Sequence, residues 1–371
     1  MSALGDAIVR LIRDEGPIPV SRYMALCLGD PRHGYYMTRD PFGVGGDFTT
    51  APEISQMFGE LIGLWAAHLW QAMGAPGRVR LVELGPGRGT LMADALRALK
   101  VVPALRAGVS VHLVETSPVL RAAQARTLSG LAEPVWHDRI ETALEGPVIV
   151  LANEFLDALP LDQFVATEAG WRERLLGLGP AGELAWGLSG ETVARLPGAR
   201  AGESGATAPG TVFEQPQAAL DVVAALSRHV AQAGGGALFI DYGATASGFG
   251  DTLQAVKAHR FVEVLAEPGE ADLTVHVDFA RMARAGLANG AAAHGPATQG
   301  DFLLALGLAE RARALAAKAT PAQSEAIATA AARLTERGET GMGDLFKVLA
   351  LSHPALPPLP GFDLHRLPER T

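Results

Sequence analysis

The amino-acid sequence predicts an α/β protein built on a doubly wound, mostly parallel sheet. Short apolar runs bounded by turn residues recur along the chain, as expected of strands that a parallel sheet buries on both faces. Segments with apolar residues at helical spacing alternate with these runs. In addition, the run Val79–Leu84 leads through three glycines into a helical pattern, which is the strand–turn–helix unit of such sheets.

Composition narrows the classes of function. The chain has 371 residues, of which 48% are hydrophobic, so it can bury a sizeable core. A formal charge of −9 without a lysine-rich run argues against nucleic-acid partners and against adhesion to anionic membranes. Cys27 is the only cysteine, which excludes an intramolecular disulfide and a cysteine-based zinc site. His259, His276 and His294 lie far apart in the sequence without the spacing of metal ligands, and we expect no metal centre.

The sequence also suggests where the protein resides. No apolar stretch approaches the length of about 18 residues that a membrane span needs. Asp6, Asp14 and Glu15 lie in or just after the first helical pattern, and organelle transit peptides avoid acidic residues. We therefore expect a cytoplasmic protein without a signal or transit peptide and without membrane insertion. The composition, rich in alanine and glycine and with arginine favoured over lysine, suggests a bacterial source.

The chain is longer than one hydrophobic core usually grows, and we expect a core domain with additions. Residues 1–76 are predicted to form an N-terminal helical extension with a lid loop. Residues 77–371 are predicted to form the Rossmann-like domain, with a β insertion at 161–190 and a helical insertion at 279–337.

The N-terminal segment reads as helices separated by turns. Apolar periodicity predicts helices at residues 1–13, 22–28 and 54–65. Thr50-Ala-Pro-Glu53 has the pattern of a capping box that opens the third helix. The glycine-rich loop before it contains Asp47, Phe48 and Thr50. This loop is either a plain helix start or a lid that contacts a ligand.

The glycine turn is the most informative motif. It reads Glu83-Leu-Gly-Pro-Gly-Arg-Gly-Thr90, so its glycines are Gly85, Gly87 and Gly89. A dinucleotide fingerprint needs a glycine where Thr90 stands, and a P-loop needs a closing Gly-Lys-Ser/Thr. The spacing is instead the form seen in class I methyltransferases that use S-adenosylmethionine. An ordinary glycine-rich connection is the alternative.

Acidic residues follow the next two predicted strands. Glu115 ends the strand at 110–115, where doubly wound sheets place the carboxylate that binds ribose hydroxyls. Asp138 ends a short strand at 134–138. Its carboxylate is placed either to meet an adenine amino group or to cap the following helix.

A third polar group follows the buried strand at 147–152. Asn153, Glu154 and Asp157 leave the sheet at its carboxyl edge, where ligands bind in this class of fold. Two carboxylates and an amide are costly to desolvate without partners, which favours a functional role over solvated loop acids.

The second half of the chain alternates again. Strands are predicted at 163–167, 172–178 and 184–188, as an antiparallel hairpin or meander, and at 237–242, 273–277 and 344–351. Helices are predicted at 216–233, 279–293, 301–318 and 321–336, and the last opens with a capping box at Thr320.

Several motifs together resemble one family. They are the glycine turn and residues 46–63, 151–160, 240–243, 271–279 and 342–349. In this order they resemble the MidA family, whose mitochondrial members are complex I assembly-factor arginine methyltransferases. The resemblance implies a class I S-adenosylmethionine fold. It further implies methylation of an arginine in a protein partner, which in the mitochondrial relatives is a complex I subunit.

The resemblance assigns roles to the candidate residues. The glycines and Glu83 would hold the methionine part of S-adenosylmethionine, with Asn153 nearby, while Glu115 and Asp138 would bind the ribose and the adenine. Glu154 and Asp157 would accept the hydrogen bonds of a substrate guanidinium. Two alternatives stay open: a small-molecule methyltransferase, and an assembly factor that binds cofactor without turnover.

Overall fold

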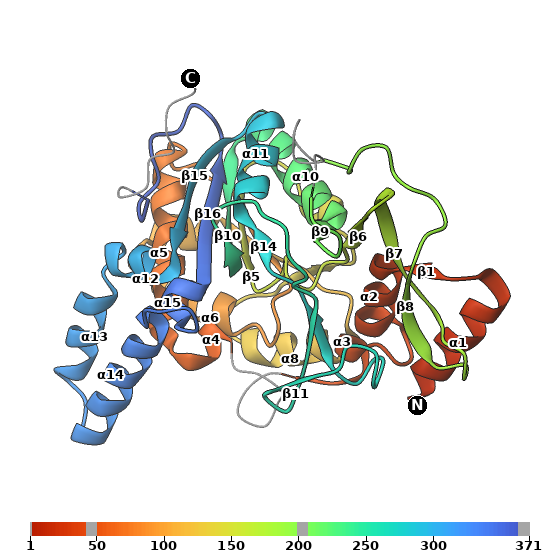
Figure 1. Ribbon diagram of the computed structural model, residues 1–371. Coiled ribbons are helices and arrows are strands. Elements are labelled where there is room, and N and C mark those ends of the chain that lie inside the picture. Colours follow the sequence, from red (N-terminus) through yellow and green to blue (C-terminus); the bar gives the residue numbers. More distant parts are fainter. Residues whose placement is uncertain (1, 42–49, 199–206, 363–371) are drawn as a thin grey trace. The chain divides into compact units, whose positions relative to one another are not determined.

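The chain folds into two units, each assembled from three separate stretches (Figure 1). The computed structural model describes residues 2–41, 50–198 and 207–362. The larger unit comprises Pro41–Leu156, Val222–Ala246 and Val277–Thr371. The smaller unit comprises Met1–Asp40, Asp157–Asp221 and Ser247–His276. The expected N-terminal extension is thus divided, with its first 40 residues in the smaller unit and the rest in the larger.

The larger unit contains a mixed eight-stranded sheet in the order β15-β16-β10-β5-β2-β3-β4, with β14 paired to β10. Neighbouring strands from β4 to β10 run parallel, and β16 runs antiparallel to both β10 and β15. The predicted α/β fold is therefore confirmed. The strands are β2 Val79–Leu84, β3 Val109–Val114, β4 Val135–His137, β5 Val148–Asn153, β10 Gly235–Ala244, β14 Val277–Asp278, β15 Ala292–Thr298 and β16 Phe346–Ser352.

Helices of the larger unit pack on this sheet or on one another. They are α4 Ala51–Ile54, α5 Gln56–Ala72, α6 Thr90–Ala98, α7 Pro103–Gly108, α8 Pro118–Leu128, α9 Ile140–Ala143, α11 Phe279–Ala288, α12 Gln299–Ala305, α13 Leu308–Ala316, α14 Pro321–Thr335 and α15 Met342–Leu345, with a 3-10 turn at Leu99–Val101. Helix α10, Gln217–Ala233, crosses the boundary between the units. A Cβ atom on Gly63 of α5 would lie 2.7 Å from Cα of Ala95, so only glycine allows α5 and α6 to approach this closely.

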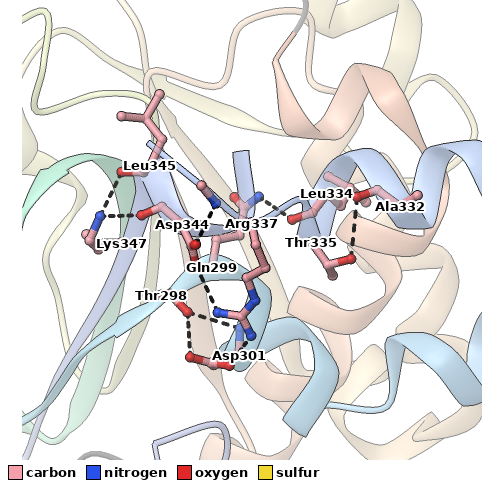
Figure 2. Close-up of polar contacts among 11 residues, drawn as sticks. Thr298, Gln299, Asp301, Ala332, Leu334, Thr335, Arg337, Asp344, Leu345 and Lys347 are labelled. Atoms are coloured by element: carbon pink, nitrogen blue, oxygen red, sulfur yellow. Dashed lines mark hydrogen bonds and ion pairs between the residues drawn. The ribbon is translucent and has the colours of Figure 1, made fainter. Parts of the chain in front are cut away.

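The C-terminal helices are joined by a polar network (Figure 2). Arg337, which follows α14, forms ion pairs with Asp301 of α12 and with Asp344 of α15. The Gln299 side chain donates to the Leu334 carbonyl oxygen at 3.0 Å. These bonds connect α12, α14 and α15 beside their apolar contacts.

Three predictions for this part of the chain are wrong in detail. The helix expected at 279–293 ends at Ala288, because Gly290 has a positive φ of 91°, and β15 follows. The helix expected at 301–318 is divided into α12 and α13 at Gly307, where φ is 96°. The strand expected at 273–277 is divided between two sheets, as β13 and β14. The capping box at Thr320 is confirmed.

The smaller unit is mainly antiparallel. Its five-stranded sheet has the order β1-β7-β6-β9 with β8 paired to β7, and a three-stranded sheet has the order β12-β11-β13. The elements are α1 Ala3–Glu15, β1 Ile18–Pro19, α2 Val20–Gly29, α3 Tyr35–Thr38, β6 Asp162–Thr167, β7 Gly170–Leu178, β8 Leu184–Leu188, β9 Val212–Gln215, β11 Gln254–Lys257, β12 Arg260–Val262 and β13 Asp272–Thr274. The predicted antiparallel strands at 163–188 are confirmed, whereas β1 and β9 were not predicted.

Across the described ranges, the helices are too short or too polar for any of them to traverse a lipid bilayer.

Candidate functional site

The strand order of the larger unit places a pocket at one edge of the sheet. Strand β2 lies between β3 and β5, so the chain leaves it in one direction and later returns on its other side. In doubly wound sheets, ligands bind at this reversal, outside the carboxyl ends of the strands. A pocket of about 390 Å³, counting the part open to solvent, lies there. It is lined by Thr50, Pro52, Glu53, Glu83, Gly85, Pro86, Gly87, Arg88, Thr90, Leu91, Asn153 and Glu154.

The glycine turn forms one wall of this pocket. Gly85, Gly87 and Gly89 have φ values of 59°, 51° and 83°, a region that residues with a Cβ atom rarely adopt. Gly85 and Gly87 line the pocket. Gly89 is the N-cap residue of α6, and a Cβ atom there would lie 3.5 Å from Cα of Gln124 on α8. The backbone conformation favours glycine at all three positions, and of the three only Gly85 and Gly87 line the pocket.

Glu83, near the end of β2, is a buried acid in the pocket wall. Its side chain is 3% exposed, and burial raises the pKa of the carboxyl well above its usual range. No described residue hydrogen bonds to its Oε2 atom. A buried acceptor without a donor is unfavourable, so this position favours a ligand that brings donors or positive charge.

Asn153 is the last residue of β5, Glu154 follows it, and both line the pocket. Glu154 has a positive φ of 51°, which is strained for a residue other than glycine. Its Oε1 atom accepts hydrogen bonds from the Ala51 backbone N–H at 3.1 Å and from the Asn153 amide at 3.0 Å. These bonds hold the carboxylate in one orientation beside α4. The Oδ1 atom of Asn153 is buried, and no described residue donates to it.

The loop after β5 is fixed by a residue that sequence reasoning did not single out as functional. Asp241 of β10 is 1% exposed, and its Oδ2 atom accepts from the backbone N–H groups of Phe155 at 3.1 Å and Leu156 at 2.9 Å. Its signal in the sequence was a lone acid within the apolar run of β10.

Asp157 belongs to the smaller unit, whereas Glu154 belongs to the larger. Asp157 is buried, and its carbonyl oxygen accepts from the Val275 N–H at 3.1 Å. Within the same unit, the Tyr36 hydroxyl donates to Asp272 at 2.8 Å. Burial, together with the charges of Asp272 and Asp157, raises the pKa of Tyr36. Asp157 and Asp272 are thus two buried acids near Tyr36 in the smaller unit.

Glu115 lies just after β3, and protein groups hold its carboxylate. Oε1 accepts from the Ser117 N–H at 2.8 Å, and Oε2 accepts from the Gln124 amide at 3.2 Å. Burial raises the pKa of Glu115, against these hydrogen bonds. Gln124 also donates to the Gly87 carbonyl at 2.8 Å and accepts from the Trp136 indole at 2.8 Å. Gln124 therefore links the glycine turn to Glu115.

Gln124 was recognisable in the sequence as a polar residue at an apolar position of its helix. It lies with Leu120, Ala123 and Leu128 on the buried face of α8, where a polar residue needs partners.

Asp138 is largely exposed and forms an ion pair with Arg121 at 2.6 Å. The N-cap residue of α9 is Arg139, so the helix-cap interpretation of Asp138 is wrong. Neither Asp138 nor Glu115 lines the pocket described above.

The predicted capping box at Thr50 is also wrong. The Thr50 side chain makes no cap hydrogen bond, although Thr50 is buried and lines the pocket. Glu53 instead accepts a hydrogen bond from the Thr90 hydroxyl at 2.6 Å. This partner, 37 positions along the chain, takes the place of the Thr50 backbone N–H that a capping box would have used. Asp47 and Phe48 lie outside the described residues.

Comparisons with known proteins agree with this geometry. Residues 61–297 match the model of the Methyltransf_28 family, described as "Putative S-adenosyl-L-methionine-dependent methyltransferase". A mitochondrial protein of Drosophila melanogaster, named protein arginine methyltransferase NDUFAF7 homolog, is 37% identical over 92% of this chain and 82% of its own length. The Homo sapiens protein arginine methyltransferase NDUFAF7 is 36% identical over 82% of this chain and 73% of its own length.

One solved structure is similar along almost the whole chain. It is a Burkholderia thailandensis protein bound to S-adenosyl-homocysteine, 30% identical, with a TM-score of 0.81. The match covers 98% of this chain and 95% of that protein.

Proposed function

The chain belongs to the MidA family of S-adenosylmethionine-dependent methyltransferases, and on that premise we propose that it methylates arginine side chains of a protein. We propose a subunit of a complex I-type respiratory enzyme as the substrate. The observation that carries the proposal is the position of Glu154. Its oriented carboxylate lies in the same pocket as the glycine turn, and a carboxylate is the group that binds a guanidinium through paired hydrogen bonds.

The residues of the pocket fit the cofactor. The methionine end of S-adenosylmethionine carries an ammonium group, which has three N–H donors and a positive charge. Glu83 Oε2 and Asn153 Oδ1 are buried acceptors that lack donors from the described residues, and both residues line the pocket. We assign them to this ammonium group, and Gly85 and Gly87 to close approach of the backbone. The bound cofactor supplies a methyl group on a sulfonium, ready for in-line displacement.

The remaining cofactor contacts are proposed from the sequence pattern. Glu115 is assigned to the ribose hydroxyls and Asp138 to the adenine. In support, Gln124 connects Glu115 to the glycine turn. Thr50 is proposed to contact cofactor or substrate, because it lines the pocket.

The protein's contribution to transfer is orientation of the acceptor nitrogen. A guanidinium is charged at neutral pH. A carboxylate that binds two of its N–H groups localises the positive charge on those nitrogens and directs the third nitrogen toward the methyl group. Glu154 is proposed for this role, with Asp157 as the second acid. The bonds from Ala51 and Asn153 fix the Glu154 carboxylate before substrate arrives.

The test separates cofactor binding from transfer. Purified protein is incubated with S-adenosylmethionine and a protein extract, and methylarginine is mapped by mass spectrometry. Glu154→Gln keeps an acceptor for the Ala51 N–H and removes the charge. We expect this variant to bind S-adenosyl-homocysteine as the native chain does and to lose transfer by at least 100-fold.

Other outcomes decide against the proposal. Loss of cofactor affinity in Glu154→Gln would contradict the assigned role. Methylation of a metabolite pool with no protein product would favour a small-molecule methyltransferase. Cofactor binding without any methylated product would favour a binding role in assembly.

A further inference from the structure

A buried carboxylate on β10 holds the loop that carries Glu154. Asp241 is 1% exposed, and its Oδ2 atom accepts from the N–H groups of Phe155 at 3.1 Å and Leu156 at 2.9 Å. Its Oδ1 atom accepts from the Tyr242 N–H at 2.9 Å. A buried carboxylate is costly to desolvate, and charge-assisted bonds from three backbone N–H groups offset that cost. The two bonds to the loop therefore fix the backbone directly after Glu154.

The same strand also fixes the backbone of Glu154 itself. Glu154 has a φ of 51°, and its N–H donates to the Ile240 carbonyl oxygen at 2.8 Å. This bond follows directly on the last pair of the β5–β10 ladder, Asn153 with Ile240. A strained conformation of this kind persists only where the surrounding bonds over-determine the backbone. Ile240 and Asp241, adjacent in β10, supply such bonds to three successive residues of the loop.

The loop also contacts the glycine turn. A Cβ atom on Gly85 would lie 2.9 Å from Cδ2 of Phe155, so the ring approaches the turn where only glycine leaves room for it. On the side of α4, Oε1 of Glu154 accepts from the Ala51 N–H at 3.1 Å. The bonds to Asp241 therefore hold two neighbouring residues of the loop, one against the glycine turn and one in the pocket.

We propose that Asp241 is a positioning residue for methyl transfer, because it holds Glu154 in its strained conformation and Phe155 against the glycine turn. The acid that binds the substrate guanidinium then keeps a fixed place relative to the methyl donor. The inference rests on the role of Glu154 proposed above and adds the residue that keeps its carboxylate in place. Asp241 does not line the pocket, so it acts through the loop. A displacement of about 1 Å can cost about 100-fold in rate.

The experiment compares Asp241→Ala and Asp241→Asn with the control Asp344→Asn. Alanine removes every bond that the carboxylate makes. Asparagine keeps one oxygen, which can accept from the two loop N–H groups while its amide nitrogen faces the Tyr242 N–H. Asp344 is the matched control, because its Oδ2 atom also accepts from a backbone N–H, that of Gly338 at 2.8 Å, and it does not line the pocket (Figure 2). Each variant is titrated with S-adenosyl-homocysteine and assayed for methylarginine in a protein extract at saturating S-adenosylmethionine.

We expect Asp241→Ala to bind S-adenosyl-homocysteine within about 3-fold of the native chain, which shows that it is folded, and to transfer methyl groups about 10- to 100-fold more slowly. Asp241→Asn should lose about 3- to 10-fold in rate, because two donors face each other at Tyr242. Asp344→Asn should keep the native rate. A native rate in Asp241→Ala would overturn the proposal, and so would a loss of cofactor affinity as large as the loss of rate. If Asp241→Ala does not fold, a native rate in Asp241→Asn would overturn it.

Two further measurements separate positioning from general stability. In Asp241→Ala, amide hydrogen exchange in the segment 153–156, followed by mass spectrometry, should be faster by about 10-fold, because two of its N–H groups lose their acceptor. Unchanged exchange would overturn the positioning role. In the Glu154→Gln background, Asp241→Ala should cause no further loss of transfer, since Asp241 acts through Glu154. An equal loss in both backgrounds would contradict this. A native chain that methylates no arginine would overturn the proposed function, and the exchange result would still decide whether Asp241 holds the loop.

Discussion

We predict that a pair of histidines on the neighbouring strands β3 and β4 makes the stability of the larger unit depend on pH. His112 Nδ1 and His137 Nε2 are 2.9 Å apart, and Ser110 and Thr142 bond to the outer nitrogens of the pair. His112 is 6% exposed. Burial, together with the charges of Arg80 and His137, lowers its pKa from 6.5 to about 4, and Glu145 opposes this shift weakly.

The sign of the effect follows from this depressed pKa. Above pH 6.5 the His112 imidazole is neutral in both the folded and the unfolded chain. The contribution of the neutral ring to the free energy of unfolding is then fully present. As pH falls from 6.5 toward 4, the unfolded chain takes up the proton and the folded protein does not, so folding loses stability. At pH 5 the free energy of unfolding should be about 2 kcal/mol lower than at pH 8 through His112 alone.

The measurement is urea denaturation at pH 8, 6 and 5 for the native chain and His112→Gln. Asp94 also titrates here, because burial raises its pKa to about 6, and it shifts stability in the opposite direction. Both proteins contain Asp94, so the difference between them isolates His112. The stability advantage of the native chain should shrink by about 2 kcal/mol between pH 8 and pH 5. A difference that stays constant over this range would refute the reasoning.

Two further predictions concern the packing and capping of helices. Thr320→Ala removes the capping box of α14 and should lower the free energy of unfolding by about 1 kcal/mol, whereas Thr320→Ser should not; equal stabilities in urea would contradict the capping role. Gly63→Leu places atoms where the α6 backbone lies and should cost about 3 kcal/mol or prevent folding. Gly29→Ala, where no heavy atom lies within 4 Å, is its control and should leave the melting temperature nearly unchanged.

The sequence predicted the centre of the fold because its signals there are local. The apolar run of β2, the three glycines and the periodicity of α6 are adjacent in the chain, and the structure places them as predicted. Strand β15 was missed because its sequence, Ala-Ala-His-Gly-Pro-Ala-Thr, contains Gly and Pro, and Thr298 is its one residue of a type that favours strands. Its conformation depends on pairing with β16, more than 40 residues later.

The sequence predicted the pocket residues that lie at the ends of strands, but not all of the hydrogen bonds that their side chains make. Glu83 was expected there from the glycine-turn motif and Asn153 from its place after a buried strand, and both line the pocket. The local capping rule assigned Glu53 to Thr50, but the tertiary hydrogen bond from Thr90 prevails. Spacing also predicted that Glu154 and Asp157 share one loop, and both lie in the connection between β5 and β6; the spacing did not indicate that the boundary between the two units falls between them. Contacts between distant segments are not encoded in spacing along the chain.

The place of β16 in the sheet has a consequence for synthesis on the ribosome. This last strand lies between β10 and β15, and it begins about 100 residues after β10 ends (Figure 1). At about 5 to 20 residues per second, a nascent chain carries an incomplete sheet for about 5 to 20 seconds. During that time, most of one edge of β10 has no strand beside it, and such edges pair readily with other chains. Stalled or truncated chains that end before Phe346 should therefore be the ones that need chaperones.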